Sequence, residues 1–298
     1  MKKRAVSVML TAAMVSAMLA GCGSKNAETQ SAADTTAESA ASGDETSADT
    51  QAADAETTDA ETTDASKTDG TFTVGFDQDF PPMGFVGDDG EFTGFDLEMA
   101  AEVAKRLNLM IAYQPIAWDA KDMELDAGTI DCIWNGFTMN VREDDYEWSK
   151  PYMKNNQVFV VRGDSDINSE ADLAGKNVEV QTDSSAEAAL NDNSELTSTF
   201  GSLTPVADYN TAFMDLESGA VDAIAMDDVV ASYQITSRKA DFKVLDDVIA
   251  AEEYGIGFKK GNTGLRDKVQ ATLEEMAADG TAAKISEKWF GKDITTIQ

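Results

Sequence analysis

The chain has 298 residues, a formal net charge of −32 and no histidine. So strong an acidic charge argues against binding to nucleic acid and against electrostatic attachment to anionic lipid. The lack of histidine excludes Ser-His-Asp and Cys-His nucleophiles and every zinc motif that contains histidine, and the sequence has no phosphate-binding glycine loop. We therefore expect a protein without a catalytic site, a metal or a cofactor.

Residues 1–22 have the pattern of an export signal. A positively charged start precedes an apolar run that is too short, and too rich in Ala and Ser, to span a membrane. The run ends in Leu-Ala-Gly-Cys at residues 19–22, which resembles the lipobox of bacterial lipoproteins. This resemblance implies that Cys22 becomes the lipidated first residue. The alternative is an ordinary secretory signal with a chance cysteine.

Residues 23–70 form a segment that consists mainly of Ala, Thr, Ser, Asp, Glu and Gln and lacks any large apolar residue. Such a composition buries too little apolar surface to offset the entropy of ordering, so the segment is predicted to be a disordered acidic tether. The remaining residues, 71–298, exceed the usual size of a single domain and suffice for two lobes.

From residue 71 onward, short β-like runs alternate with amphipathic helices, which predicts an α/β fold. Asp96 is expected to cap a helix over 97–107, and Asp228 to cap a later helix. Cys132 lies in a strand-like run and is expected to be a small buried hydrophobe without a disulfide partner. The expected strands are 71–76, 109–114, 130–134, 158–162, 177–181, 221–226 and 242–248, and the last long helix is expected at 264–278.

The segment 123–133 is echoed by the segment 214–224. Each copy has the pattern of a helix end, a Gly at the helix stop and a short buried strand. The alternative is a coincidence, because such units are common in α/β proteins, but matching hydropathy along both copies favours two lobes built on one plan. Ligands of open parallel sheets bind beyond the carboxyl ends of the strands. Residues 134–138 and 225–228 are therefore expected on opposite walls of one cleft.

The chain from 71 to 298 resembles the family 3 extracellular solute-binding proteins, the amino-acid receptors of ABC importers. Several short motifs in the same order carry this resemblance: Val74-Gly75-Phe76-Asp77, Phe80-Pro81-Pro82, Gly94-Phe95-Asp96-Leu97, Gly128-Thr129-Ile130-Asp131, Asn135-Gly136-Phe137-Thr138 with Arg142, Trp148-Ser149-Lys150-Pro151-Tyr152, Asp172-Leu173-Ala174-Gly175-Lys176, Val221-Asp222-Ala223 with Asp227, and Tyr254-Gly255-Ile256-Gly257.

The resemblance implies the two-lobed α/β fold of type II periplasmic binding proteins. Two hinge strands, expected near 157–161 and 253–257, would join the lobes. Lobe 1 would comprise 71–157 plus 254–298, and lobe 2 would comprise 158–253.

The resemblance also implies a site for a free amino acid. Arg142 matches the position that binds the ligand's carboxylate, for which a planar guanidinium is suited, and Asp227 matches the acid that holds the ligand's ammonium. The spacing from Thr138 to Arg142 is shorter than in many relatives, and the alternative is a surface arginine. Gly136, Phe137 and Thr138 belong to the segment that meets the backbone of the ligand; the alternative there is a simple strand-to-loop turn.

Two further groups complete the expected site. Ser184 and Ser185 open a helix whose free N–H groups suit a carboxylate. Selectivity for the ligand's side chain is expected to rest on a carboxylate, two aromatic rings and an amide, which are Asp77, Phe80, Trp118 and Gln181.

The implied function is the substrate-binding component of an ABC importer for a polar amino acid. The protein would be a monomer that binds the free amino acid by hinge closure and delivers it to the permease subunits. Its Cys22 lipid would hold it on the outer face of the cell membrane. Cystine, histidine, arginine, lysine and glutamine all remain open as ligands. The alternatives are a dehydratase of the same fold and a sensory ligand-binding domain.

Overall fold

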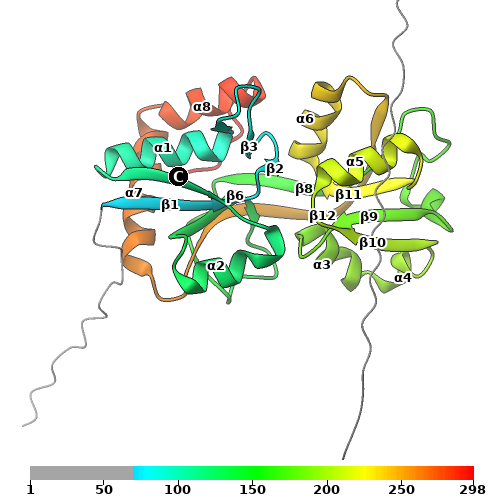
Figure 1. Ribbon diagram of the computed structural model, residues 1–298, viewed down its shortest axis with the longest axis horizontal. Coiled ribbons are helices and arrows are strands. Elements are labelled where there is room, and N and C mark those ends of the chain that lie inside the picture. The colour runs from blue at the N-terminus through cyan, green and yellow to red at the C-terminus, as the bar shows by residue number, and fades with distance from the viewer. Residues whose placement is uncertain (1–69) are drawn as a thin grey trace, which may run out of the picture. The chain divides into compact units, whose positions relative to one another are not determined.

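The computed structural model describes residues 70–298 (Figure 1). The predicted export signal, the lipidated Cys22 and almost all of the predicted tether lie outside these residues.

One mixed sheet runs through the described part of the chain, in the strand order β10-β9-β11-β8-β12-β6-β1-β5, with β7 paired to β12. Its strands are β1 (Thr71–Phe76), β5 (Met110–Pro115), β6 (Cys132–Thr138), β7 (Glu147–Trp148), β8 (Met153–Arg162), β9 (Asn177–Gln181), β10 (Ser202–Val206), β11 (Ala223–Asp227) and β12 (Phe242–Phe258). A small second sheet contains β2 (Asp79–Phe80), β3 (Gly84–Val86) and β4 (Phe92–Thr93). All the strands expected from the sequence are present, so the α/β class is confirmed.

The sheet has two parallel halves, β5-β1-β6 and β10-β9-β11, which the antiparallel strands β8 and β12 connect. Helices gather around each half, as Figure 1 shows. We call the half β5-β1-β6 and its helices lobe 1. These helices are α1 (Phe95–Arg106), η1 (Trp118–Ala120), α2 (Lys121–Ala127), α7 (Thr263–Ala278) and α8 (Thr281–Phe290). Lobe 2 is the second half with η2 (Glu170–Leu173), α3 (Ser185–Asp192), α4 (Ser194–Thr197), α5 (Tyr209–Ser218) and α6 (Asp228–Arg238).

The sequence echo corresponds to a structural repeat. Helix α2 ends at Gly128 and α5 ends at Gly219, both in the left-handed conformation that glycine adopts without strain. Each helix then leads into a buried strand, β6 or β11. The Asp131 carboxylate accepts the Thr73 N–H of β1 at 2.7 Å, and Asp222 accepts the Asn177 N–H of β9 at 2.9 Å. The two aspartates therefore fasten equivalent neighbouring strands in the two lobes.

Two predicted helix caps are wrong. Helix α1 begins after Gly94, and its first N–H groups donate to the Pro82 and Met83 carbonyls, so no capping side chain is needed. Asp96 instead lies inside the helix with its side chain fully buried. Asp228 is the first residue of α6 rather than its cap, and its carboxylate accepts the Asn156 amide at 3.0 Å.

Cys132 is fully buried on β6 and free, as expected. Beside β6 lies a cluster of aromatic side chains around Phe137. Its ring packs against Trp118, Tyr146 and Trp148 with centroids 4.8–5.4 Å apart. Such ring pairs each stabilise the folded state by about 0.5–1.5 kcal/mol beyond the effect of their buried area. This cluster therefore stabilises the carboxyl end of β6.

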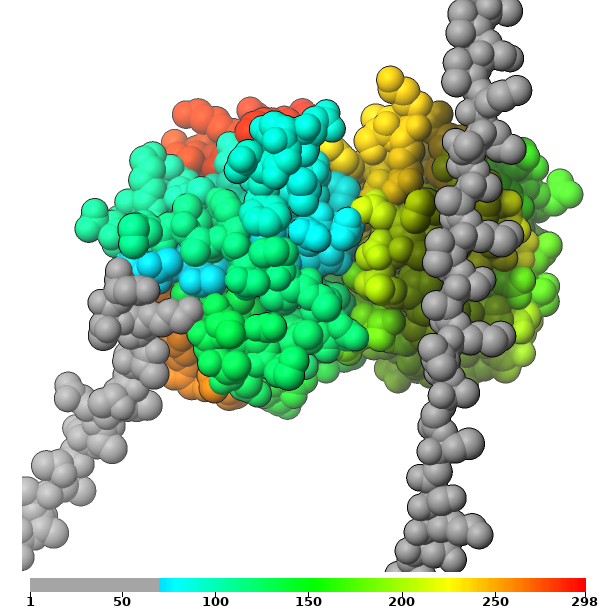
Figure 2. Space-filling model, viewed as in Figure 1, coloured from blue at the N-terminus to red at the C-terminus, as the bar shows by residue number. Residues whose placement is uncertain are grey.

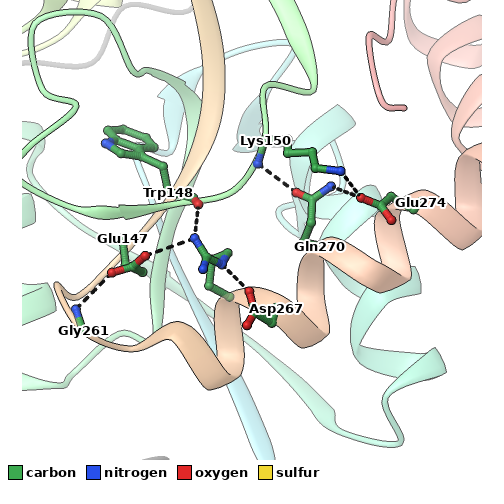
Figure 3. A network of polar contacts seen from close by, with 8 residues as sticks. Glu147, Trp148, Lys150, Gly261, Asp267, Gln270 and Glu274 are labelled. Carbon is green, nitrogen blue, oxygen red and sulfur yellow. Dashed lines mark hydrogen bonds and ion pairs between the residues drawn. The ribbon is translucent and has the colours of Figure 1, made fainter.

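Helix α7 is attached to the segment that carries β7 (Figure 3). The Arg266 guanidinium donates to the Glu147 carboxylate at 3.0 Å and to the Trp148 carbonyl at 2.9 Å. One turn further along, Gln270 accepts the Lys150 N–H at 2.8 Å. These contacts join the C-terminal part of the chain to lobe 1 and hold Trp148 against Phe137.

The two lobes touch each other across the cleft. The segment that carries β2–β4, cyan in the space-filling view, lies against the yellow-green surface of lobe 2 (Figure 2). There the Asn210 amide of α5 donates to the Asp79 carboxylate at 2.8 Å, and the rings of Phe85 and Tyr233 lie 5.8 Å apart. The structure is therefore in a closed arrangement.

Candidate binding site

A cavity lies between the lobes, where the carboxyl ends of β6, β9 and β11 converge. This is the position at which open α/β sheets bind ligands. In this closed arrangement the side chains leave room for about one water molecule within it. The lining residues are Phe80, Trp118, Asn135, Gly136, Thr138, Arg142, Gln181, Ser184, Ser185 and Asp227. All the residues predicted for the site are in this set except Asp77 and Phe137, and Asn135 joins them.

The wall from lobe 1 depends on Gly136, which has φ 58°. A Cβ at this position would come within 3.0 Å of the Phe80 ring and 3.2 Å of the Tyr254 ring, so only glycine fits. The Gly136 N–H donates to the buried Asp96 carboxylate at 2.6 Å, and the Tyr152 hydroxyl donates to the same oxygen at 2.9 Å. Burial raises the pKa of Asp96 to about 7. Asp96 therefore fixes the strand end that faces the cavity.

Arg142 follows a tight turn after β6. The turn closes with a hydrogen bond from the Arg142 N–H to the Met139 carbonyl at 3.0 Å. It places Val141 at φ 63°, a conformation rare for a β-branched residue. The guanidinium carbon lies 5.4 Å from the centre of the Phe137 ring. One guanidinium nitrogen donates across the cleft to the Asp183 carbonyl at 3.0 Å. Phe137 itself is fully buried, and its ring packs against the Arg142 guanidinium.

Asp227 at the end of β11 lines the cavity, and Glu252 on β12 lies next to it, hydrogen-bonded to the lining residues Thr138 and Ser185; the exposed fractions of the two acids are 4% and 6%. These two acids and their hydrogen-bond partners are called the floor of the cavity below. The Gln157 amide donates to both of them, at 2.8 Å and 3.0 Å. The Asn155 amide also donates to both, at 2.7 Å and 3.2 Å. Asp227 and Glu252, called the acid pair below, are therefore side by side in a region of low dielectric constant.

Burial, and then the negative charge of Glu252, raise the pKa of Asp227 to about 7. The Tyr254 hydroxyl donates to Asp227 and opposes this rise. Across the floor, the Thr138 hydroxyl donates to Glu252 at 2.8 Å and lies 3.2 Å from the Ser185 hydroxyl. The floor is thus acidic and rich in hydrogen-bond acceptors, which suits an ammonium group.

The helix start in lobe 2 has the predicted form. The Ser184 hydroxyl accepts the Glu187 N–H at 3.1 Å and caps α3. Ser184 and Ser185 both line the cavity. Capping by Ser184 is therefore compatible with a position at the cavity wall.

The cavity lining also contains two aromatic rings and an amide, those of Phe80, Trp118 and Gln181. Asp77 stands behind Gln181, whose amide donates to it at 2.7 Å across the cleft. Burial raises the pKa of Asp77 to about 6. Asp77 does not line the inner cavity but faces an outer one of about 500 Å³ at the mouth of the cleft.

Lys121 packs against Trp118 of the cavity lining, and sequence reasoning missed it. Its side chain is 1% exposed, its ammonium lies 5.2 Å from the Trp118 ring centre, and it forms an ion pair with Asp183 of lobe 2. Together with the bond from Arg142 to the Asp183 carbonyl, this pair ties the lobes at one rim of the cavity. Glu252, Gln157 and Asn155 were also not foreseen, whereas Asn135 belongs to the segment 134–138 that was expected on the cleft wall.

Within residues 70–298, no group of acidic, Cys or His side chains could hold a metal ion. No helix in the same part of the chain has the length and apolar character to cross a bilayer.

Comparison with known proteins places this geometry in context. Residues 72–292 match the bacterial extracellular solute-binding proteins, family 3. The L-cystine-binding protein TcyJ of Escherichia coli K12 is 34% identical over 228 residues, covering 76% of this chain and 84% of that protein. The L-cystine-binding protein TcyA of Bacillus subtilis 168 is 32% identical over 227 residues, covering 75% and 82%.

A solved structure shows the same architecture. It is an ABC uptake transporter substrate-binding protein from Streptococcus pneumoniae with bound histidine. The likeness has a TM-score of 0.74 and 34% identity, and it covers 76% of this chain and 95% of that one. The predicted two-lobed α/β fold is confirmed by this likeness.

Proposed function

The chain belongs to the bacterial extracellular solute-binding proteins of family 3, and we propose that it captures one free polar amino acid by hinge closure and delivers it to the permease of an ABC importer. Proteins of this family and the relatives compared above are binding components of transport systems. The ligand is a zwitterion whose carboxylate binds Arg142 and whose ammonium binds Asp227.

The observation that carries this proposal is the placement of opposite charges on opposite walls of one cavity. Arg142 comes from lobe 1 and Asp227 from lobe 2, and both line the same space. A guanidinium binds a carboxylate through two parallel hydrogen bonds, and a charge-assisted bond is worth about 1.5–3 kcal/mol. A ligand that bridges the two residues therefore favours the closed arrangement over an open one.

The remaining residues of the site take complementary roles. Gly136 and Thr138 meet the backbone of the ligand, and Ser184 and Ser185 offer hydroxyl and N–H groups from the start of α3. Phe80, Trp118 and Gln181 surround the ligand's side chain, and Asp77 acts through Gln181. Phe137 acts through Arg142 rather than by contact with the ligand.

Hinge motion requires two lobes joined by few strands. We place the lobe boundaries at 71–157 with 254–298, and at 158–253. The support for this division is that β8 and β12 are the strands by which the two parallel halves of the sheet are joined.

The proposed location follows from the N-terminal sequence. The lipobox-like residues 19–22 support an anchor at Cys22, and the acidic segment 23–70 acts as a tether between the anchor and the binding lobes. The mature protein works as a monomer on the outer face of the cell membrane and is not an enzyme.

A thermal-shift screen with the twenty amino acids and L-cystine tests the function. At least one polar amino acid should raise the melting temperature, because it binds the folded state alone. Calorimetry then compares the wild type with Arg142→Ala and Asp227→Ala, each of which should weaken binding by about 10- to 100-fold or more. Arg106→Ala is the matched control, because Arg106 pairs with Glu102 and Asp279 outside the cavity. A screen without any shift contradicts the function, and unchanged affinity in both variants contradicts the site.

A further inference from the structure

The acid pair is unusual because its two carboxylates share neutral donors instead of a cation. Gln157 and Asn155 each donate to both acids, yet among residues 70–298 neither Asp227 nor Glu252 takes part in an ion pair within 4.0 Å. Two neighbouring carboxylates in a buried site repel each other, and this repulsion favours a shared proton or a bound cation at the pair.

A second observation also points to a ligand at this place. The Tyr209 side chain of α5 is fully buried, and its hydroxyl lies near the Ser184 side chain without forming a well-aligned hydrogen bond to any described residue. The charges of Asp227 and Glu252 both act on this hydroxyl, so it lies near the acid pair. Its ring packs against Phe80 of the cavity wall, with the centroids 6.0 Å apart. A buried hydroxyl without a well-aligned hydrogen bond near two acids can still bond to a further polar group.

We infer that Glu252 is a ligand-binding residue that shares the ligand's ammonium group with Asp227, and that the proton held by the acid pair leaves when the ammonium binds. This inference rests on the proposed function. It adds Glu252 to the residues that bind the ligand, and it adds the release of one proton to the binding reaction. The exchange is balanced: one carboxyl O–H bond breaks, the proton passes to solvent, and the two resulting carboxylates accept N–H bonds from the ligand's ammonium.

The surroundings of the pair support this exchange. Burial and the charge of Glu252 raise the pKa of Asp227 to about 7, so a proton is present on the pair near neutral pH. Asp77 and Tyr152 act on the neighbours of Asp227, and the other titratable groups near it are Asp228 on α6, Tyr254 on β12 and Tyr209 on α5. Asp228 is a further negative charge, and burial raises the pKa of Tyr254 and Tyr209 well above their usual range. None of these groups supplies a positive charge that could replace the proton.

Proton linkage gives the direction of the pH effect. A carboxyl that is protonated in the free protein below pH 7, and ionised in the complex, weakens binding as the pH falls. The dissociation constant should therefore rise by up to about tenfold for each pH unit below 7. The α-ammonium of the ligand stays charged below pH 7 and does not contribute to this rise.

The experiment is calorimetry with the full chain and the amino acid that gives the largest shift in the thermal screen. Titrations at pH 6.0, 7.0 and 8.5 in buffers of different ionisation enthalpy count the protons released. The wild type should release close to one proton at pH 6.0 and about half a proton at pH 7.0, and at pH 8.5 it should release none and instead take up a fraction of a proton to charge the α-amino group of the ligand. The N-acetyl derivative of the same amino acid, which has no ammonium, should release none.

Glu252→Gln should weaken binding at pH 8.5 by about 10- to 100-fold. It should also reduce the proton release at pH 7.0, because Asp227 then titrates without a neighbouring charge. Glu253→Gln is the matched control on the same strand, because the side chain of Glu253 is exposed; its affinity and proton count should equal those of the wild type.

The outcomes separate this inference from the function. Binding at pH 8.5 without proton release at pH 6.0 overturns the inference and leaves the function standing. Unchanged affinity and proton count in Glu252→Gln also overturn it. If no amino acid binds at any pH, both the function and the inference are wrong. The proton count of the wild type decides the matter even if the variant does not fold.

Discussion

Replacement of Asp183 by Asn should open the cleft and weaken ligand binding. In the closed arrangement, the Asp183 carboxylate is the ion-pair partner of Lys121, whose side chain is 1% exposed. The amide of Asp183→Asn leaves the Lys121 ammonium buried without a counter-charge, while the main-chain carbonyl that accepts Arg142 is retained. The closed state is therefore penalised and the open state, in which Lys121 can reach water, is not.

The structure bounds the size of this effect. Loss of one partner of a fully buried ion pair costs about 3–5 kcal/mol. The side chain of Asp183 is 50% exposed, so solvent screens the pair, and we take about 1–3 kcal/mol for the closed state. Because the ligand binds the closed state, this penalty appears as a dissociation constant about 5- to 150-fold higher.

Calorimetry measures the affinity, and small-angle scattering measures the radius of gyration with and without ligand. The double variant Lys121→Met with Asp183→Asn removes the stranded charge and should recover most of the affinity. Asp126→Asn is the control, because it breaks an exposed pair with Lys259 within lobe 1. If Asp183→Asn keeps both the wild-type affinity and the wild-type scattering profile, the reasoning about Lys121 is refuted.

Further substitutions test the supports of the site. Arg266→Ala should lower the free energy of unfolding by about 1–2 kcal/mol in urea denaturation, because it frees α7 from β7; Lys150→Ala, which breaks an exposed pair, should cost less than about 1 kcal/mol. Val141→Gly should raise the free energy of unfolding by about 0.5–1 kcal/mol, because it removes the strain at positive φ. A lower free energy of unfolding in this variant would contradict the strain at Val141. The pKa of Asp96 is raised from 3.8 to about 7, so the stability that it contributes is full below pH 3.8 and lost as the pH rises towards 7. Asp96→Asn should remove this slope, at most about 1.4 kcal/mol per pH unit, in melting curves from pH 4.5 to 8.0.

The regular elements were predictable because their signals are local. Apolar runs marked the buried strands, and Gly128 and Gly219 marked the ends of two helices that do stop there. The repeat was visible because each lobe uses the same helix, glycine and strand in the same order. Asp96 shows the limit of such signals. An acid before an apolar helix has the pattern of a cap, but the loop carbonyls of Pro82 and Met83 already satisfy the helix start.

The cavity was predictable in part. Its walls lie at strand ends and at one helix start, which short motifs identify. The floor was missed because Gln157 and Glu252 lie within the long strands β8 and β12, far from each other in sequence. The adjacent acids Glu252 and Glu253 carried a usable signal, since successive residues of a strand face opposite sides and one of them therefore points inward. The sequence alone does not say which one faces the cleft.

Lys121 could not be found from the sequence for a similar reason. A lysine at the start of a short helix usually lies in solvent, and its burial here depends on Asp183, which the other lobe brings to it. Contacts that exist only when the lobes close have no local pattern in either segment.

A crystal structure of the protein with its tightest-binding amino acid tests the central claim most directly. The account predicts a single ligand between the lobes, with its carboxylate within about 2.7–3.2 Å of the Arg142 guanidinium and its ammonium at the same distance from the Asp227 carboxylate. A ligand whose two charged ends both rest on one lobe, or which occupies the outer cavity beside Asp77 while Arg142 faces solvent, would contradict it.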